Sequence, residues 1–456
     1  MRIAVIGGGL TGLTAAWRLT LAGHEATVIE ASHRLGGFIQ TEASGGWLAE
    51  AGPSSFIDSS PAAAAVIKDL GLSGQRIESS PAASNRYVVM GGQLVPLPRP
   101  SDAAALVSTP LFSMRAKLRI TAEAARTPIE RESDLSVADI VREHFGTEIL
   151  ERLVQPFVGG IYAGDPERLS ARHAFPKLWE AERTVGSLLR AGMAGARERE
   201  QLGLPGATAV VSFRRGMQTL TDALAGHLPA ESKMLGARVR VAFSGRKLVP
   251  WRVGWDTPQG LRYGDFERVI SALPAWALAA LEIGEPGRRP LDQLSLIEHP
   301  PLASVFVGYR REDVAHPLDG FGALVPATEG RSVLGIIFSS SLFPGRAPAG
   351  HVALTALVGG ALQPDLAKLP AKELEARVRA DLGDLLGARG EPAFVRHHAW
   401  PRSIPQYNLG YGSHLAAMGR CEDELEDFFI GGIARDGIAV PDAVAAGESL
   451  ARRALG

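Results

Sequence analysis

The chain has 456 residues, and its 48 lysine and arginine residues nearly balance 49 aspartate and glutamate residues, for a formal net charge of −1. This length predicts roughly two to three domains. The balance of charge gives no indication of a nucleic-acid partner, and we expect none. The single cysteine, Cys421, excludes an intramolecular disulfide and a thiolate metal cluster. No run of about 18 to 20 uncharged apolar residues is present, so we expect no membrane-spanning helix.

The first 29 residues predict a strand, a helix and a second strand. Residues 2–6 are apolar and β-rich, as expected of a buried parallel strand. Residues 13–21 follow a helical pattern that Gly23 closes, and residues 26–29 form the second strand. This order is that of a nucleotide-binding βαβ unit.

Three glycines lie between the first strand and the helix. Gly7, Gly9 and Gly12 form a G-x-G-x-x-G pattern, and Glu30 follows the second strand. Gly7 permits a tight turn, Gly9 lets the backbone approach a pyrophosphate, and Gly12 lets helix and strand pack closely. Glu30 can accept hydrogen bonds from ribose hydroxyls. A glycine-rich turn without a ligand is the alternative, but the complete order favours a dinucleotide site.

The segments beyond Glu30 favour FAD over a nicotinamide cofactor. Residues 31–37 read Ala-Ser-His-Arg-Leu-Gly-Gly, and residues 50–54 read Glu-Ala-Gly-Pro-Ser. Both resemble segments of two-dinucleotide-binding flavoproteins. Residues 428–455, a short strand, a glycine-containing loop and an alanine-rich helix, resemble the closing flavin-binding segment of that superfamily. An ordinary final strand and helix is the alternative. We therefore expect a FAD-binding domain assembled from both chain ends, with the middle determining the substrate.

Several motifs in the middle of the chain carry a more specific resemblance. They are RLGGFIQT (34–41), NRYVVMGGQLVPLP (85–98), GGIYAGDPERLSARHAFPKLWEAE (159–182), SFRRGMQTLTDAL (212–224), FGALVP (321–326), LGIIFSSSLFPGRAP (334–348) and WPRSIPQYNLGY (400–411). In this order they resemble the oxygen-dependent protoporphyrinogen oxidases, FAD enzymes of late haem synthesis within the flavin amine oxidase superfamily. Ser54 departs from the Asn or Asp frequent in that family, and residues 431–442 lack its usual Asn-containing turn.

The resemblance implies an α/β fold with three parts. A Rossmann-like FAD-binding domain would comprise residues 1–82, 206–274 and 396–456. A β-rich substrate-binding domain would comprise residues 83–98 and 275–395, and a helical membrane-binding insert residues 99–205. The residues expected at FAD are Gly7, Gly8, Gly9, Leu10, Thr11, Gly12, Glu30, Ala31, Arg34, Gly36, Gly37, Gly52, Pro53, Ser54, Ser55, Val239, Trp400, Ile438, Ala439 and Val440.

The implied reaction is the oxidation of protoporphyrinogen IX to protoporphyrin IX, with dioxygen as acceptor and hydrogen peroxide as by-product. We expect no catalytic side chain, since the cofactor carries the difficult chemistry. Three alternatives stay open. The substrate could be coproporphyrinogen III, oxidised to coproporphyrin III. The enzyme could be another dehydrogenase of the superfamily, acting on an amine or a carotenoid. The chain could also be a non-catalytic porphyrin-binding flavoprotein.

Five residues are expected at the substrate. Arg86 would hold a propionate by two parallel hydrogen bonds, unless it is a solvated surface group. Gly159 and Gly160 would let the backbone lie flat against a tetrapyrrole, with a glycine-rich hinge as the alternative. Leu324 and Phe338 would sandwich the pyrrole rings, with core packing as the alternative.

Residues 106–120 combine an apolar block with adjacent cations. They include Leu106, Val107, Leu111, Phe112, Met114, Arg115, Lys117 and Arg119. Such a segment suits a membrane interface, and a buried helix with a charged end is the alternative. We expect a cytoplasmic protein attached peripherally to the inner face of the cell membrane, and a homodimer stays open. Because His397 and His398 would point to opposite faces of a strand, we expect no metal site.

Overall fold

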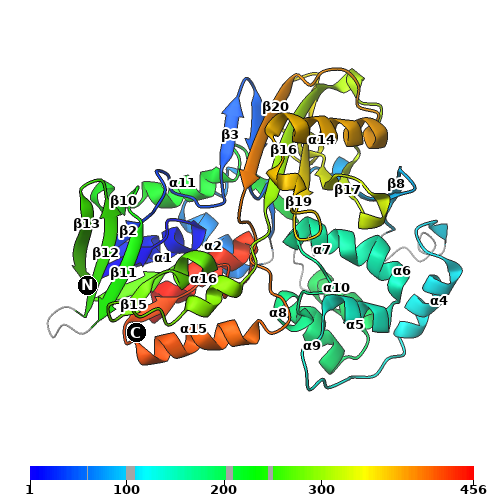
Figure 1. The fold of residues 1–456 in the computed structure, drawn as a ribbon. Coiled ribbons are helices and arrows are strands. Elements are labelled where there is room, and N and C mark those ends of the chain that lie inside the picture. Colours follow the sequence, from blue (N-terminus) through cyan, green and yellow to red (C-terminus); the bar gives the residue numbers. More distant parts are fainter. Residues whose placement is uncertain (59, 99–107, 202–208, 245–249) are drawn as a thin grey trace.

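The computed structural model describes residues 1–58, 60–98, 108–201, 209–244 and 250–456. The fold is mixed α/β (Figure 1). A parallel sheet with its helices lies on one side of the molecule, and a larger sheet carrying the long helix α14 lies on the other. Residues 108–201, which we call the helical region, form the third part, below the larger sheet in this view.

The parallel sheet contains both ends of the chain. Its strand order is β10-β2-β1-β14-β21, and every neighbouring pair is parallel. The strands are β10 (Lys233–Met234), β2 (Glu25–Ile29), β1 (Arg2–Ile6), β14 (Arg268–Ser271) and β21 (Phe428–Ile430). The strands expected near both chain ends are therefore confirmed. Their near-continuous burial is typical of a parallel sheet covered on both faces.

Helices from opposite ends of the chain pack together on this sheet. Helix α1 (Leu10–Leu21) begins directly after Gly9, three residues earlier than expected, so Gly12 lies in its first turn. Helix α16 (Val440–Arg453) lies against it. A Cβ added to Gly447 of α16 would lie 2.6 Å from the Thr11 carbonyl oxygen, so only a glycine permits this approach. The further helices around the sheets are α2 (Pro61–Asp69), α11 (Gln218–Gly226), α12 (Ala275–Ala279) and α15 (Gly412–Glu424).

A seven-stranded sheet has the order β20-β16-β19-β18-β17-β7-β8. Helix α14 (Ala371–Leu386) packs one stripe of leucine and valine side chains against one face, since Leu374, Val378 and Leu382 are all fully buried there. The short helix α13 (Ser339–Leu342) follows β18. The strands are β20 (Phe394–Trp400), β16 (Leu302–Arg310), β19 (His351–Gly359), β18 (Val333–Ile337), β17 (Gly320–Leu324), β7 (Asn85–Met90) and β8 (Gln93–Pro96).

Smaller elements complete the sheets. One sheet has the order β13-β12-β11-β15, a second pairs β3 with β4, and a third has the order β5-β9-β6. The strands are β13 (Gly260–Phe266), β12 (Trp251–Thr257), β11 (Val239–Ser244), β15 (Glu282–Gly284), β3 (Thr41–Ser44), β4 (Trp47–Glu50), β5 (Phe56–Ile57), β9 (Val210–Phe213) and β6 (Arg76–Glu78). Short 3-10 turns are η1 (Pro81–Ala83), η3 (Ala230–Ser232), η4 (Asp292–Leu296), η5 (Arg311–Asp313), η6 (Ala327–Glu329) and η7 (Leu366–Lys368).

The helical region contains seven helices and one π-helical turn within its described residues. They are α4 (Met114–Glu123), α5 (Val137–His144), α6 (Thr147–Ile149), the π turn η2 (Leu150–Val154), α7 (Gln155–Tyr162), α8 (Ala171–Ala174), α9 (Pro176–Thr184) and α10 (Leu188–Gln201). No helix in the described part of the chain is both long and apolar enough to cross a membrane.

The structure corrects the expectation for residues 106–120. Leu106 and Val107 lie outside the described residues. The side chains of Leu111 and Phe112 are 1% and 5% exposed, because they pack into the core of the helical region. The prediction that these two residues face a membrane is therefore wrong. Met114 and Leu118 of α4 are instead 68% and 66% exposed.

Candidate functional site

Gly7 and Gly9 lie in the turn between β1 and α1, and Gly12 lies in the first turn of α1. Gly7 has φ +105°, in the region that favours glycine, and a Cβ on Gly12 would lie only 2.0 Å from the Gly7 carbonyl oxygen. Gly9 is the N-cap of α1, and no side chain caps the helix. A Cβ on Gly9 would meet only Gly37, at 3.9 Å. The first N–H groups of α1 therefore face a space that an anion can approach.

Glu30 lies directly beyond β2, beside this turn. One carboxylate oxygen accepts the Gly8 N–H at 2.7 Å, and the other accepts the Ser32 N–H at 2.8 Å. These bonds fix the orientation of the carboxylate and leave further acceptor sites on both oxygens. The Glu30 carbonyl oxygen accepts the Ala237 N–H at 2.8 Å, which brings the chain before Val239 to the same edge. Glu30 thus keeps free acceptor sites beside the turn, and its role at the ribose stays a prediction.

The second glycine pair interlocks with the first. The Gly36 N–H donates to the Gly8 carbonyl oxygen at 2.8 Å, and a Cβ on Gly37 would lie 3.1 Å from the Gly9 Cα. The Arg34 guanidinium donates to the carbonyl oxygens of the same loop, including that of Ile39 at 3.1 Å. Burial lowers the pKa of Arg34. Arg34 therefore holds the loop through its backbone, and Ala31 lies at the loop's exposed start.

The segment containing Gly52, Pro53, Ser54 and Ser55 runs beside this loop. A Cβ on Gly52 would lie 2.0 Å from the Phe38 carbonyl oxygen. The Trp400 indole N–H donates to the Ala51 carbonyl oxygen at 2.9 Å, and its ring lies 5.0 Å from that of Phe38. Trp400, at the end of β20, is thus joined to Phe38 and Ala51, although they are far apart from it in the sequence.

The closing loop leads into α16 through Ile438, Ala439 and Val440. Gly437 has φ +112°, and the Ala439 N–H donates to the Asp442 carboxylate at 3.0 Å. Burial raises the pKa of Asp442. These three positions lie at the amino-terminal end of α16. The middle of α16, at Gly447, lies against Thr11 in the first turn of α1.

Two of the five residues expected at the substrate, Arg86 and Leu324, lie on one face of the larger sheet, and a third, Gly160, lies against that face. Leu324 of β17 is in register with Val88 of β7, and both pack toward the helical region. Arg86, two positions before Val88, points to the same face because side chains alternate along a strand. The Leu324 Cδ2 atom would lie 3.2 Å from a Cβ on Gly160 of α7. Arg86 is exposed, its guanidinium lies 5.6 Å from the Phe321 ring centroid, and it forms no ion pair with any described residue.

Phe338 and Gly159 have different surroundings. Phe338 is fully buried on the opposite face of the sheet, where its ring lies 5.5 Å from that of His316 and 6.4 Å from that of Tyr87. This is the core-packing alternative, and Phe338 cannot share one ring-shaped ligand with Leu324. Gly159 and Gly160 both lie inside α7, so the segment is helical rather than an extended loop.

The family model for flavin-containing amine oxidoreductases matches residues 10–455. The chain belongs to this family. Protoporphyrinogen oxidase 2, chloroplastic/mitochondrial, from Arabidopsis thaliana is 31% identical over 98% of this chain and 92% of its own length. Coproporphyrinogen III oxidase from Bacillus subtilis (strain 168) is 27% identical over 99% of this chain and 97% of its own. A protein from Exiguobacterium sp. 255-15, provisionally named protoporphyrinogen oxidase, has the same fold, with a TM-score of 0.82 at 22% identity over 99% of this chain and 98% of that one.

The resemblance to protoporphyrinogen oxidases and the expectation of FAD are thereby confirmed. The described residues also fit this flavin oxidoreductase cofactor. The free amino-terminal end of α1 suits its pyrophosphate, the open approach over Gly9 admits it, and the oriented carboxylate of Glu30 suits its ribose.

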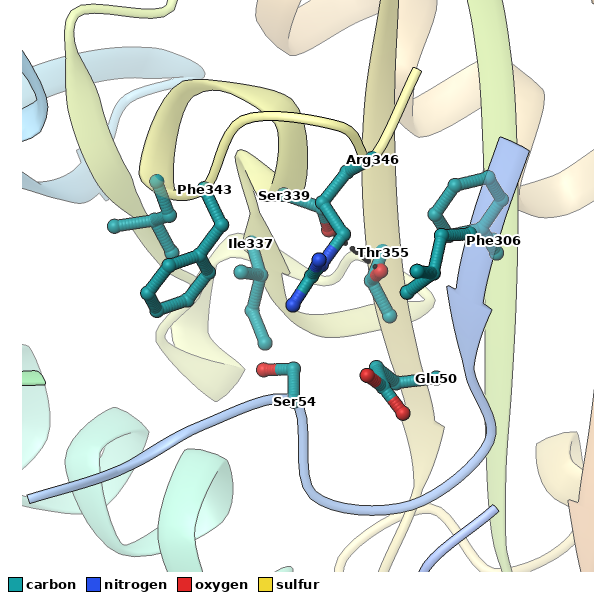
Figure 2. A pocket seen from close by; sticks show the side chains of 10 residues that line it. Glu50, Ser54, Phe306, Ile337, Ser339, Phe343, Arg346 and Thr355 are labelled. Atoms are coloured by element: carbon teal, nitrogen blue, oxygen red, sulfur yellow. Dashed lines mark hydrogen bonds between the residues drawn. The ribbon is translucent and has the colours of Figure 1, made fainter. Parts of the chain in front are cut away.

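Two buried charged residues beside Ser54 were not predicted (Figure 2). Glu50 of β4 and Arg346 face each other across a small cavity, without forming an ion pair. The carboxylate accepts from the Thr41 hydroxyl at 2.7 Å and the Met217 N–H at 2.8 Å. Burial raises the pKa of Glu50 to about 7 despite these bonds, and burial lowers that of Arg346. Glu50 stands in a segment that the sequence singled out, but only the fold shows its burial.

Two further residues, Gln406 and Tyr407, also escaped prediction. Both stand in the quoted motif at residues 400–411, yet neither has a spacing that would distinguish it. In the structure, each makes buried hydrogen bonds to a segment expected at the site.

Proposed function

We propose that this flavin oxidoreductase converts protoporphyrinogen IX to protoporphyrin IX, with dioxygen as the electron acceptor. The similarity to plant protoporphyrinogen oxidases, at more than 30% identity and nearly full length, carries the proposal. Each turnover of the macrocycle removes six hydrogens in three two-electron steps, so three dioxygen molecules become three hydrogen peroxide molecules. When bound, FAD supplies the two-electron chemistry by accepting a hydride from a bridge carbon.

The chain itself contributes binding and orientation. The amino-terminal end of α1 and Glu30 would hold the pyrophosphate and ribose ends of FAD. The partly buried Leu324 and Gly160 would lie at the edge of the site for the apolar macrocycle, and Gly160 presents no side chain to it. Since an apolar wall cannot select the rotation of a ring, Arg86 would select it through a propionate. No side chain need act as acid or base.

Coproporphyrinogen III is the second candidate, supported by the bacterial coproporphyrinogen III oxidases among the relatives. It carries four propionates, whereas protoporphyrinogen IX carries two. Arg86 is an exposed cation that forms no ion pair with any described residue, so it can pair with a propionate of either substrate. The higher identity to plant protoporphyrinogen oxidases than to the bacterial coproporphyrinogen III oxidases favours protoporphyrinogen IX. Steady-state kinetics with both porphyrinogens tests this, and a larger kcat/KM for coproporphyrinogen III would reverse the assignment.

Substitutions of Arg86 test whether this residue binds a propionate of the substrate. We expect Arg86→Ala to raise KM roughly tenfold, because a charge-assisted hydrogen bond at a partly solvated site is lost. Arg86→Lys should recover only part of the loss, since lysine lacks the planar fork. An unchanged KM in Arg86→Ala would show that another cation binds the propionate.

We also propose peripheral association with the inner face of the cell membrane. The side chains that would make the contact are Met114 and Leu118, in place of the buried Leu111 and Phe112. Met114 and Leu118 lie one turn apart on the exposed face of α4, next to the exposed Arg115 and Arg119. Exposed apolar side chains flanked by cations suit the interface of an anionic bilayer. We keep the three domain boundaries stated above as proposals, with the helical region as the membrane-facing part.

A further inference from the structure

Residues 404–411, which we call the connecting segment, lie between the helical region and the closing flavin-side loop. The Ser170 N–H donates to the Tyr407 carbonyl oxygen at 2.8 Å, and the Leu409 N–H donates to the Arg168 carbonyl oxygen at 2.9 Å. An isolated β-bridge joins Leu169 to Asn408. The backbone of the connecting segment is therefore held against the turn that follows the Gly159-Gly160 helix.

Gln406 projects from this segment toward the end of α7. Its side chain is buried, and its amide nitrogen donates to the Tyr162 carbonyl oxygen at 2.9 Å and to that of Ile404 at 3.1 Å. Its amide oxygen is buried without a partner among the described residues. A Cβ on Gly164 would lie 2.5 Å from that oxygen, so Gly164 is what admits the Gln406 side chain.

The turn that Gln406 contacts has an unusual backbone. Ala163 has φ +49° and ψ 33°, a left-handed conformation that residues with a Cβ rarely adopt. Its carbonyl oxygen accepts the Ala361 N–H at 2.7 Å. Backbone strain of this kind persists only where surrounding contacts hold it. Two bonds supply such contacts, one from Gln406 to the Tyr162 carbonyl oxygen and one from Ala361 to the Ala163 carbonyl oxygen.

Tyr407 projects from the same segment toward the closing loop. Its buried hydroxyl donates to the Ile433 carbonyl oxygen at 2.5 Å and accepts the Gly437 N–H at 3.2 Å. Burial strongly raises the pKa of Tyr407, so the phenol stays neutral and can donate. Gly437 immediately precedes Ile438, Ala439 and Val440, the residues expected at the flavin.

We propose that Gln406 and Tyr407 are positioning residues that fix the substrate-side turn at residues 159–164 relative to the flavin-side loop at residues 433–440. Gln406 and Tyr407 are neighbours in the chain, so one short stretch contacts both segments. The proposal rests on the proposed function, because hydride transfer requires the reacting atoms to lie about 3–3.5 Å apart. Tyr407 would set the flavin side and Gln406 the substrate side of this distance.

The first test needs no substrate. Tyr407→Phe removes only the hydroxyl and leaves the Gly437 N–H without its acceptor. We expect the Kd for FAD to rise roughly 5- to 150-fold, with a shift of the visible flavin bands, because a buried backbone donor loses its partner. Gln406→Met should bind FAD within about twofold of the unmodified protein, since it does not contact the closing loop. Tyr309→Phe is the matched control, because Tyr309 of β16 is equally buried but lies outside this segment.

The second test uses porphyrinogen turnover with FAD saturating. Gln406→Met should lower kcat/KM roughly tenfold at unchanged FAD affinity, because the turn is released on the substrate side only. Tyr407→Phe with unchanged FAD affinity and flavin spectrum would overturn the flavin half of the proposal. Tyr309→Phe with an equal loss would do the same. Unchanged turnover in Gln406→Met would overturn the substrate half. If the unmodified protein does not oxidise porphyrinogen, the proposed function and the role of Gln406 both fail, whereas FAD affinity still decides Tyr407.

Discussion

The glycine turn at residues 7–12 and the centre of the helical region are both tightly packed, but they are stabilised by opposite means. In the turn, backbone lies directly on backbone, and a single added Cβ at Gly12 would lie 2.0 Å from an oxygen. In the helical region, the imidazole of His144 lies between two carboxylates. Its Nδ1 is 2.8 Å from Glu123 and its Nε2 is 2.9 Å from Glu182, and all three side chains are buried.

This difference shows what each region cannot tolerate. The turn has no room for another atom, whereas the helical region depends on polar partners for its buried carboxylates. Each ring nitrogen of His144 lies within hydrogen-bond distance of one carboxylate, so the imidazole bridges Glu123 and Glu182. Burial alone would raise the pKa of Glu182, but the bonds from Arg131 and His144 outweigh it and lower this pKa to about 2.

Adding a methyl group to the turn should give the largest effect. We expect Gly12→Ala to abolish FAD binding or to prevent the native fold, because neither Gly7 nor β1 can move away from the new Cβ. Gly226→Ala is the control, since a Cβ at Gly226 in α11 would meet no atom within 4 Å. The readout is FAD retained after gel filtration. A yellow Gly12→Ala protein with the parent FAD affinity would disprove this account of the turn.

Removing the imidazole from the helical region should give the next largest effect. His144→Ala leaves Glu123 and Glu182 buried without the side chain that bridges them, and the loss of one partner from such a buried network typically costs about 3–5 kcal/mol. We expect a lower unfolding midpoint and faster amide hydrogen exchange in α4, α5 and α9, with FAD still bound. His227→Ala, at an exposed position, should change stability by less than about 0.5 kcal/mol. Equal effects of the two substitutions would remove the distinction between the regions.

Glu50 gives a second test of how a buried charge affects stability. Its carboxylate lies beside Ser54 and faces Arg346 without forming an ion pair. Its pKa is about 7 in the fold against an ordinary value of 4.5. The folded protein therefore holds a proton that the unfolded chain releases, so stability is favoured below pH 4.5 and lost as pH rises through 7. The loss amounts to about 3 kcal/mol. Glu50→Gln should flatten the pH dependence of the unfolding midpoint between these values, and an unaltered profile would contradict the burial of this charge.

The smallest effect is expected at the surface of the helical region. Replacing Met114 and Leu118 together by Ser should weaken binding to anionic liposomes about fivefold to tenfold without changing the unfolding midpoint, because both side chains are largely exposed. The matched control replaces the exposed Leu235 and Leu261, which lie outside the helical region. Equal loss in the control, or no liposome binding by the parent protein, would remove the proposed membrane-facing surface.

The sequence predicted the flavin end because its constraints are local. The positions of Gly7, Gly9 and Gly12 follow from one turn of backbone, and Glu30 follows from the end of the next strand. The helical region joins Glu123, His144 and Glu182 across the chain, and no spacing pairs them in advance. The prediction that Leu111 and Phe112 face a membrane was wrong for the same reason. An apolar block followed by cations fits both a membrane interface and a buried helix end.

The residues expected at the substrate could be predicted only in part from the sequence. Alternation along β7 and the register with β17 place Arg86 and Leu324 on one face, which a motif alone could not establish. Phe338, directly after β18, packs on the other face of the sheet. Gln406 and Tyr407 stand in a quoted motif, but their roles depend on contacts to residues 162 and 437, which only the folded chain brings together.

Anaerobically prepared protoporphyrinogen IX, added to the FAD-loaded protein with a measured amount of dioxygen, tests the central claim most directly. Porphyrin absorbance and hydrogen peroxide are followed together, with coproporphyrinogen III in a parallel reaction. The account predicts three hydrogen peroxide molecules for each protoporphyrin IX formed and a larger kcat/KM for protoporphyrinogen IX. A protein saturated with FAD that forms neither porphyrin nor hydrogen peroxide above the uncatalysed rate would contradict the account.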